Sequence, residues 1–522
     1  MKRLITADGV VTSSGRVGNA VLIDGASVVA VGDSQDLHGA DTVESSYPGG
    51  TILPGFRDAH IHAVPYAALL DGCSLKTATS MEDLIHRLAT HARGLPADRP
   101  VVATRMDDES LAERRLPDRS DLDRAVPNRP AVIYRYCGHV AVANSEALRR
   151  SGIDASTPDP EGGSLDRDAD GVPTGVLRET AAGLVTPSLA RGARLDPDVL
   201  LSGLERLAGL GITSIGAMMG YGELPHEQLA AELDLWVEVA DRLPITVHGI
   251  VITDDAHGLS DAKRRLDRAG PRISWLGVKR FSDGSLGGHT AAMHTPFADV
   301  GTTGTLRLTD ADEAIAEIAV DLGGMVAIHA IGDRAVDGVL DIFDRLIERG
   351  AHPADLRMEH VSVISPDQVR RFADAGVIAS VQPAFLASEA AWVRDRVGPA
   401  RASWLYPFRS MLAAGIPMSG SSDSPVEPPH PLWGMASAMD RGGLADGEEL
   451  SPLQAIALFT DGAAHALREP QPLAAGAPAD LVIVDADPMT ASPDRLRKAA
   501  ILDTWIAGTP IEVDRNVPAW VD

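Results

Sequence analysis

Short apolar runs of strand length alternate with amphipathic helical stretches through most of this 522-residue chain. Such alternation is typical of βα units, in which helices connect the parallel strands of one sheet. Eight runs occur between residues 52 and 419, and eight βα units can close into a barrel, so we predict an α/β fold of the (β/α)8 TIM-like class. The predicted barrel strands are Ile52–Phe56, Ile212–Met218, Ile245–Val251, Trp275–Phe281, Met325–Ile328, Leu356–Met358, Val377–Val381 and Ile416–Ser419.

The two ends of the chain share a different pattern, in which short strands are joined by tight turns. Near the N-terminus, Asp24-Gly25 separates two apolar runs and suits the positive φ of a hairpin turn. Short strands return at residues 480–485 and 501–508. We therefore expect both ends to pair as one small β-sandwich-like domain. The expected division is residues 1–51 and 470–522 for this domain and residues 52–469 for the barrel.

The segment between the first two predicted barrel strands is too long for a single crossover helix. We therefore expect an inserted subdomain at about residues 71–210. Within it, Val101–Met106 and Ala131–Tyr136 have the composition of strands. Thr157–Pro173 is rich in proline and aspartate and is predicted to be a loop.

Charge excludes two classes of partner. The chain carries 47 basic and 73 acidic residues, a formal charge of -26, whereas nucleic acids and anionic membranes require a basic surface. No apolar segment approaches the ~20 residues of a membrane span, and the N-terminal residues lack the apolar core of a signal peptide. The two cysteines, Cys73 and Cys137, lack CxxC spacing, which favours a reducing compartment. We expect a cytoplasmic protein without a nucleic acid or membrane partner.

The first predicted barrel strand leads into a pair of histidines, His60 and His62. Residues two apart on a strand point to the same side, so both imidazoles can reach one metal ion. A pair with this spacing also occurs by chance in many proteins. The pair alone therefore indicates only that a metal could bind.

Other metal-compatible residues stand where further predicted strands end, namely His329, His360 and Asp423. In barrel enzymes the active site lies at the C-terminal ends of the strands. His329 and His360 are 31 residues apart, about one βα unit, and Asp423 follows 63 residues later, about two units. Each histidine taken singly is more often a hydrogen-bonded core residue, but their shared position favours a common metal site.

Lys279 stands at the end of the fourth predicted strand, in a chain with only five lysines among its 47 basic residues. A buried lysine with a depressed pKa can react with carbon dioxide, and the resulting carbamate offers two oxygens that can bridge two cations. Arginine could not form this group. The alternative is a lysine that extends its ammonium group to solvent from a strand end.

Asp423, in Ser421-Ser422-Asp423-Ser424-Pro425, has the chemistry of a metal ligand and of a proton carrier. A carboxylate beside an activated water can accept its proton and deliver it to a leaving nitrogen. The alternative is an N-cap, because aspartate before Ser-Pro is a common start of a helix.

Together these motifs resemble the amidohydrolase superfamily, specifically its YtcJ-like branch, amidohydrolase family 3, which includes N-substituted formamide deformylases. The resemblance extends over nearly the whole chain, including the insertion. The motifs are Leu53-Pro54-Gly55-Phe56-Arg57-Asp58-Ala59-His60-Ile61-His62, Lys279 followed by Asp283-Gly284-Ser285-Leu286-Gly287, His329-Ala330-Ile331-Gly332-Asp333, Glu359-His360, Ser422-Asp423-Ser424-Pro425, Pro117-Asp118-Arg119-Ser120-Asp121-Leu122-Asp123 and Gly138-His139.

The resemblance implies a hydrolase of non-peptide C–N bonds with two divalent ions, usually zinc, although some members work with one. The implied ligands are His60 and His62 for one ion, His329 and His360 for the other, Lys279 as a bridging carbamate, and Asp423. A metal-bound hydroxide would attack an amide or formamide-like carbonyl, with Asp423 as general base and then general acid. The expected partner is a small-molecule substrate, and the resemblance is compatible with a homodimer.

The insertion departs from the pattern of the branch and leaves the substrate open. Cys137 stands before Gly138-His139 where relatives often have an acidic residue, and Arg105-Met106-Asp107 replaces a common Gly-Trp. His139 either contacts the substrate or is a loop histidine without a catalytic role. A cyclic-amide hydrolase of the hydantoinase or dihydroorotase kind is the alternative function. A barrel protein that has lost catalysis is a further alternative, which the complete ligand set disfavours.

Overall fold

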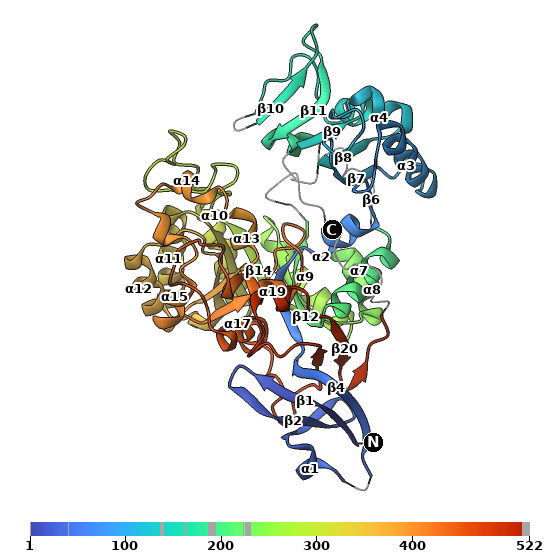
Figure 1. Cartoon of the computed structure of the whole chain (residues 1–522). Helices are drawn as coiled ribbons and strands as arrows, with labels where there is room; N and C mark the ends of the chain where they lie inside the picture. Colours follow the sequence, from blue (N-terminus) through green and yellow to red (C-terminus); the bar gives the residue numbers. More distant parts are fainter. Residues whose placement is uncertain are drawn as a thin grey trace. The chain divides into compact units, whose positions relative to one another are not determined.

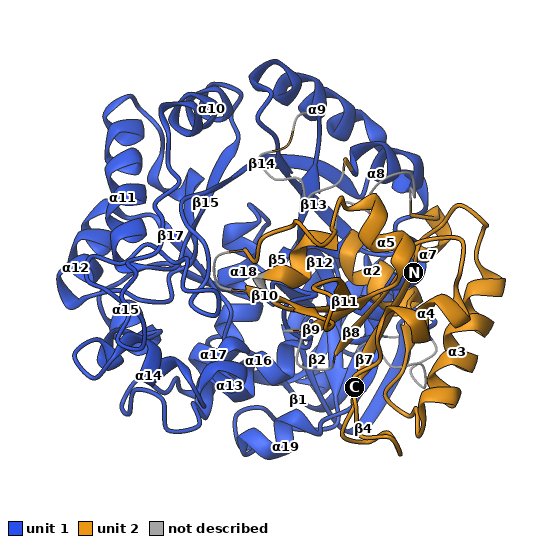
Figure 2. Cartoon of the chain, turned by 90° about the horizontal axis from the view of Figure 1, so that it is seen from above, with its two compact units in different colours: residues 1–63, 201–223, 232–519 blue, residues 64–200, 224–231, 520–522 orange. Residues whose placement is uncertain are grey.

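The computed structural model describes residues 2–39, 41–135, 140–160, 163–185, 195–222, 224 and 231–513 (Figure 1). Cys137 and His139 lie outside these residues. The chain divides into two compact units (Figure 2). The first unit contains residues 1–63, 201–223 and 232–519, and the second contains residues 64–200, 224–231 and 520–522.

The first unit contains the predicted (β/α)8 barrel. Eight strands form one sheet in the order β18-β17-β16-β15-β14-β13-β12-β5, and every pair of neighbours in this order is parallel. The C-terminal ends of all eight strands therefore lie at one face of the barrel. The strands are β5 (Phe56–Ile61), β12 (Ile212–Gly220), β13 (Thr246–Ile252), β14 (Ile273–Phe281), β15 (Met325–Ala330), β16 (Leu356–His360), β17 (Ile378–Val381) and β18 (Met418–Gly420).

The prediction of a barrel strand at Ile52–Phe56 was wrong. Ile52, Leu53 and Pro54 end strand β4 (Val43–Pro54), which pairs with the C-terminal strand β19 outside the barrel. The barrel strand begins at Phe56 and contains His60. Residues on both sides of this junction are buried, and the apolar run of β4 continues to Phe56, the first residue of β5, so hydrophobicity does not mark the point where one strand ends and the other begins.

Helices surround the barrel strands, as Figure 2 shows for α8 to α12. In α11, Val336, Val339, Leu340 and Phe343 are buried at the spacing of one helical face. Each such side chain contributes about 1.5–3 kcal/mol through burial. The helices of this unit are α8 (Leu233–Val239), α9 (Ala256–Ala269), α10 (Asp310–Asp321), α11 (Asp333–Glu348), α12 (Pro366–Ala375), α13 (Phe385–Glu389), α14 (Val393–Val397), α15 (Phe408–Ala413), α16 (Pro431–Met439), α17 (Pro452–Phe459), α18 (Asp461–Ala466), α19 (Pro493–Arg497) and α1 (Ser34–Leu37). Helix α7 (Pro197–Gly209) precedes β12.

The two chain ends pair in a separate sheet of seven strands, in the order β21-β20-β19-β4-β1-β2-β3. Strands from both ends lie side by side, blue and red in Figure 1. Ile5, Ile52, Ile483 and Trp505 belong to one buried cluster, so the ends share a core. The strands not yet given bounds are β1 (Lys2–Thr12), β2 (Gly15–Asp24), β3 (Ser27–Gly32), β19 (Leu481–Val484), β20 (Ile501–Ile506) and β21 (Thr509–Pro510).

The chain between β5 and β12 contains a sheet of six strands in the order β10-β11-β9-β8-β7-β6. The two strands predicted there are confirmed as β7 and β8. The prediction that Thr157–Pro173 is entirely a loop was wrong, because part of it pairs as β10 with β11. The elements are α2 (Ala63–Asp71), β6 (Cys73–Ser74), α3 (Met81–Gly94), β7 (Val101–Met106), α4 (Arg119–Ala125), β8 (Ala131–Arg135), β9 (Val140–Ala143), α5 (Ser145–Arg150), β10 (Gly163–Arg167) and β11 (Pro173–Glu179).

Among the described residues of both units, the helices are too short or too polar to cross a membrane.

Candidate metal centre

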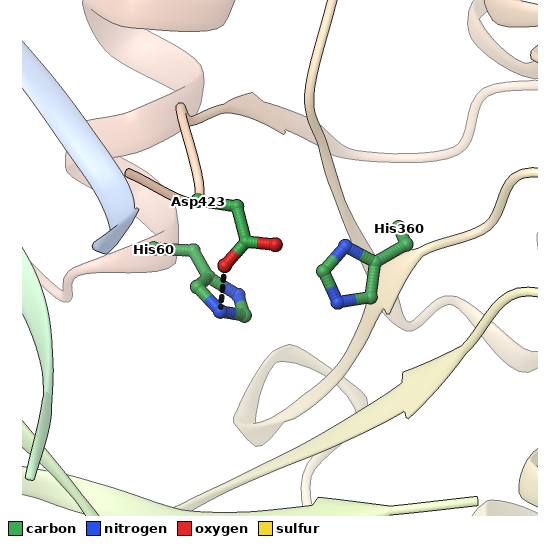
Figure 3. Close-up of side chains that lie close together, drawn as sticks. All are labelled: His60, His360 and Asp423. Carbon is green, nitrogen blue, oxygen red and sulfur yellow. Dashed lines mark ion pairs between the residues drawn. The ribbon is translucent and has the colours of Figure 1, made fainter. Parts of the chain in front are cut away.

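Three of the predicted ligands converge at the C-terminal ends of the barrel strands. His60, His360 and Asp423 each offer a ligand atom, and these atoms lie within 4.8 Å of one another. Figure 3 shows the carboxylate of Asp423 between the two imidazole rings. His60 lies in β5, His360 ends β16, and Asp423 follows β18, so the cluster depends on closure of the barrel.

Two of these residues have a left-handed backbone, with φ of 73° at His360 and 56° at Asp423. This conformation costs an L-residue about 1–2 kcal/mol, and such residues concentrate at functional sites. Asp423 does not cap a helix, because the next helix, α16, begins at Pro431. The N-cap alternative for Asp423 was therefore wrong.

The orientation of His60 is set by a buried carboxylate on another strand. Nδ1 of His60 lies 2.7 Å from Oε2 of Glu359, and Glu359 also accepts a hydrogen bond from Arg357. Burial alone would raise the pKa of Glu359, but Arg357 and His60 hold it well below its usual range. Because a carboxylate only accepts hydrogen bonds, Nδ1 of His60 donates and Nε2 faces Asp423 at 3.2 Å.

His360 is oriented in the same way by a neutral amide. Its Nδ1 lies 2.8 Å from Oε1 of Gln382, and Nε2 of Gln382 donates to Oγ of Ser421 at 2.9 Å. Burial holds the pKa of His360 well below its usual value, and His329 lowers it further. His360 is therefore a neutral imidazole in which Nδ1 contacts Gln382 and Nε2 does not. A neutral imidazole in this arrangement is the form that binds a metal ion.

His329 lies beside this cluster but is not one of its three convergent donors. Its ring centroid is 4.5 Å from that of His360. Its Nε2 donates to the carbonyl oxygen of Gly284 at 2.8 Å and lies 3.2 Å from Oδ1 of Asp283. Nδ1 is thus the ring nitrogen that remains for a ligand.

His62 directly follows β5, and its Nε2 lies 3.4 Å from Oδ1 of Asp423. Burial lowers the pKa of His62. Burial alone would raise the pKa of Asp423, but His60 and His62 hold it well below its usual range. Burial alone would lower the pKa of His60, but the carboxylates of Asp423 and Glu359 raise it above its usual value. The centre thus combines an ionised carboxylate with imidazoles.

Lys279 is 1% exposed, and its Nζ lies 3.7 Å from the centroid of the Phe281 ring. Burial lowers its pKa to about 8, against the opposing effect of Glu359 and Asp423. The alternative of a lysine that reaches solvent is wrong, because the side chain is enclosed. A neutral amine is the form that reacts with carbon dioxide, and the lowered pKa increases its fraction at neutral pH.

These donors suit a divalent cation of borderline character. Imidazole nitrogens with their second nitrogen engaged, and a buried ionised carboxylate, are the ligands that zinc prefers. A cation would also offset the negative charge that Asp423 brings into a buried site.

Two residues that belong to the sequence motifs, Glu359 and Asp283, were given no role from the sequence. A role for Glu359 could have been inferred because Arg357 and Glu359 are charged residues at i and i+2 in a strand whose other residues before His360 are apolar. Asp283 is buried and accepts backbone N–H groups of Ala292, Ile331 and Gly332. Gln382, which follows β17, contacts His360.

Comparison with known proteins places the chain in a family. A family model described as "Amidohydrolase family" matches residues 48–511. The protein YtcJ of Bacillus subtilis (strain 168), named as an amidohydrolase, is 29% identical over 487 residues, which cover 90% of each chain. The N-substituted formamide deformylase of Arthrobacter pascens is 29% identical over 524 residues, which cover 94% of each chain.

Solved structures agree with these matches. An uncharacterized metal-dependent hydrolase from Pyrococcus furiosus has a TM-score of 0.74 at 29% identity, with 94% of this chain and 100% of that chain covered. The atrazine chlorohydrolase TrzN from Arthrobacter aurescens TC1, solved with zinc, has a TM-score of 0.56 at 15% identity, with 100% and 97% covered. The second likeness concerns the fold alone.

Proposed function

Because the chain belongs to the amidohydrolase family, whose model spans residues 48–511, we propose that this metal-dependent hydrolase cleaves a linear amide of the N-substituted formamide kind. The convergence of His60, His360 and Asp423 within 4.8 Å is the observation that carries this proposal. The likeness to an N-substituted formamide deformylase over 94% of the chain supports the substrate class.

In this proposal two divalent ions, most suitably zinc, are held by the residues at the strand ends. The proposed ligands are His60, His62 and Asp423 for one ion, His329 and His360 for the other, and Lys279 as a carbamate between them. When bound, such ions activate a water molecule and polarise the carbonyl of the substrate. A single bound ion is the alternative occupancy.

Asp423 carries the proton in the proposed reaction. As the water oxygen bonds to the amide carbon, one water proton passes to the carboxylate of Asp423. The carboxyl group then returns this proton to the amide nitrogen as the C–N bond breaks, which yields a carboxylic acid and an amine. The low pKa of Asp423 keeps it ionised before each cycle.

Lys279 becomes a ligand only after reaction with carbon dioxide. The lone pair of its neutral Nζ bonds to the carbon of carbon dioxide and a proton leaves for solvent, which produces a carbamate anion. The burial that lowers the pKa of Lys279 to about 8 supports this step. We also propose a cytoplasmic location, because a chain with two cysteines suits a reducing compartment.

A substrate panel tests the proposed function. Zinc-loaded protein is assayed with N-substituted formamides, linear acetamides and hydantoins, alongside His60→Ala and a control, His352→Ala, which removes an exposed histidine outside the centre. We expect formamide hydrolysis that His60→Ala abolishes and His352→Ala retains. Preferential hydrolysis of hydantoins would support the cyclic-amide alternative instead. Tight zinc binding without hydrolysis of any of these compounds would support a barrel protein that has lost catalysis.

A further inference from the structure

Asp58 is a buried carboxylate on β5 with 2% of its surface exposed, two residues before His60. We propose that Asp58 is a positioning residue that holds the loop carrying Asp423 against β5 through the side chain of Ser422. The Asp423 carboxylate and the first-strand histidines would then be held as one unit. This role rests on the proposed function, because it concerns the placement of Asp423 for metal binding and proton transfer.

Both oxygens of Asp58 are engaged with the loop after β18. Oδ1 accepts the backbone N–H of Ser422 at 3.0 Å and that of His60 at 3.2 Å. Oδ2 accepts the hydroxyl of Ser422 at 2.5 Å. The same Ser422 hydroxyl oxygen accepts the backbone N–H of Ser424 at 3.0 Å. One carboxylate therefore connects the residues on either side of Asp423 to β5.

Backbone hydrogen bonds continue this connection on the other side of Asp423. The N–H of Asp423 donates to the carbonyl oxygen of His60 at 2.9 Å, and the N–H of His62 donates to the carbonyl oxygen of Ser424 at 2.9 Å. Asp58, His60 and His62, at alternate positions in β5 and the residue that follows it, thus each hydrogen-bond to a residue of the loop. A displacement of the loop would thus break several hydrogen bonds together.

The backbone conformation of Asp423 makes such a restraint necessary. Asp423 has a left-handed backbone with φ of 56°, which an L-residue keeps only when its surroundings fix it. Asp58, Ser421, Ser422 and His430 also line one small cavity of about 10 Å³. In this proposal the hydrogen bonds to Asp58 determine where Asp423 points.

Three serine variants separate a positioning role from general stability. Ser422→Ala removes the hydroxyl that connects Asp58 to Ser424, whereas Ser422→Thr keeps a hydroxyl. The matched control is Ser419→Ala on β18, because Ser419 is also fully buried and its hydroxyl has no hydrogen-bond partner among the described residues. The measurements are the Zn²⁺ dissociation constants of the metal-free proteins, their thermal unfolding, and kcat and KM for an N-substituted formamide.

We expect Ser422→Ala to weaken Zn²⁺ binding by about 10- to 100-fold and to lower kcat by a similar factor with little change in KM, since groups that orient metal ligands have effects of this size. Ser422→Thr should recover most of both, and Ser419→Ala should match the wild type. Asp58→Asn tests the same connection from the side of β5. It keeps one acceptor oxygen and should fold even if Ser422→Ala does not.

Two results would overturn the inference alone, and both are distinguishable from a failure of the proposed function. If the wild type binds Zn²⁺ and hydrolyses the formamide but Ser422→Ala and Asp58→Asn bind and hydrolyse equally well, Asp58 has no positioning role. Equal losses of Zn²⁺ affinity and kcat in Ser422→Ala and Ser419→Ala would likewise overturn the inference, because they would show a general effect of substitutions in the β18 region. If the wild type itself binds no Zn²⁺, the proposed function fails and the inference fails with it.

Discussion

Three of the four predicted histidine ligands have one ring nitrogen engaged by a hydrogen-bond acceptor of the protein that is not itself a predicted ligand. His60 uses Glu359, His360 uses Gln382 and His329 uses Gly284. These contacts select the tautomer and fix the ring plane before any ligand binds. At the scale of single residues, the centre therefore depends on the acceptors as much as on the histidines.

Removal of the charge on Glu359 tests this dependence. Glu359→Gln replaces the ionised acceptor of His60 by a neutral one and leaves Arg357 without its carboxylate partner. We expect Zn²⁺ affinity to fall by about 10- to 100-fold. The control is Glu348→Gln, which changes an exposed glutamate of α11 and should bind Zn²⁺ as the wild type does. Unchanged affinity in Glu359→Gln, measured by competition with a chelator, would contradict this role.

The buried charge of Lys279 predicts a pH dependence of stability in the metal-free protein. Its pKa is about 8 in the folded state, against a usual 10.5. Below pH 8 the lysine is protonated in both the folded and the unfolded protein, and burial of its charge lowers the free energy of unfolding by about 3 kcal/mol. Between pH 8 and 10.5 this penalty disappears as the pH rises.

Lys279→Met, in metal-free protein kept free of carbon dioxide, should therefore unfold at higher urea concentration than the wild type at pH 7. The difference should shrink as pH rises from 8 towards 10.5. Lys263→Met, which changes a partly exposed lysine of α9, should not gain stability. A difference between Lys279→Met and the wild type that is constant from pH 7 to 9.5 would show that the charge is not the cause.

Sequence reasoning could select the strand-end histidines, Lys279 and Asp423 because chemistry and spacing along one chain are enough for that. It could not assign Glu359 or Asp58 a role, because their partners are remote. His60 and Glu359 are 299 residues apart, and Asp58 and Ser422 are 364 residues apart. Such pairs are set by closure of the barrel.

At the scale of elements, the positions of the donors follow from close approach of neighbouring strands. On β14, a Cβ atom on Gly277 would lie 1.9 Å from the carbonyl oxygen of Met325 on β15. Gly277 is two residues before Lys279, so the glycine allows the register that places Lys279 beside the other donors. Sequence periodicity predicted β14 and β15, but it could not place the boundary between β4 and β5, where the apolar end of β4 continues into Phe56 of the buried strand β5.

Gly277→Ala should therefore separate β14 from β15 and displace Lys279. We expect a loss of stability of about 1–3 kcal/mol, as for other overpacked core sites, together with reduced metal content. Gly94→Ala is the control, because a Cβ atom at the end of α3 would meet no atom within 4 Å. Urea unfolding and metal analysis of both variants check this. Wild-type stability and metal content in Gly277→Ala would contradict the role of the close approach.

At the scale of the whole molecule, the two compact units differ in their relation to the centre. All six proposed ligands belong to the unit that contains the barrel. The other unit has its own buried cluster, which includes Leu84, Leu88, Val101 and Ile133. Sequence reasoning could anticipate an insertion from the length of the gap, but not the pairing of β10 with β11, because a segment rich in proline and aspartate does not have the composition of a strand.

Metal removal should consequently affect one unit alone. A ligand that binds only the folded state stabilises it by about 4 kcal/mol at 1,000 times its dissociation constant. In calorimetric scans, a chelator should lower the transition of the barrel unit by at least about 5 °C and leave the transition of the other unit in place. Equal shifts of all transitions, or no shift, would contradict this separation.

Reconstitution of metal-free protein with Zn²⁺, with bound metal and hydrolysis of an N-substituted formamide followed together, tests the central claim most directly. Wild-type protein should be inactive without metal and reach full activity at two ions per chain, with Lys279 as the carbamate ligand. Lys279→Arg should bind fewer ions and be at least about 100-fold less active. Full activity in metal-free wild type, or two bound ions and undiminished hydrolysis in Lys279→Arg, would contradict a two-metal hydrolase that depends on this lysine.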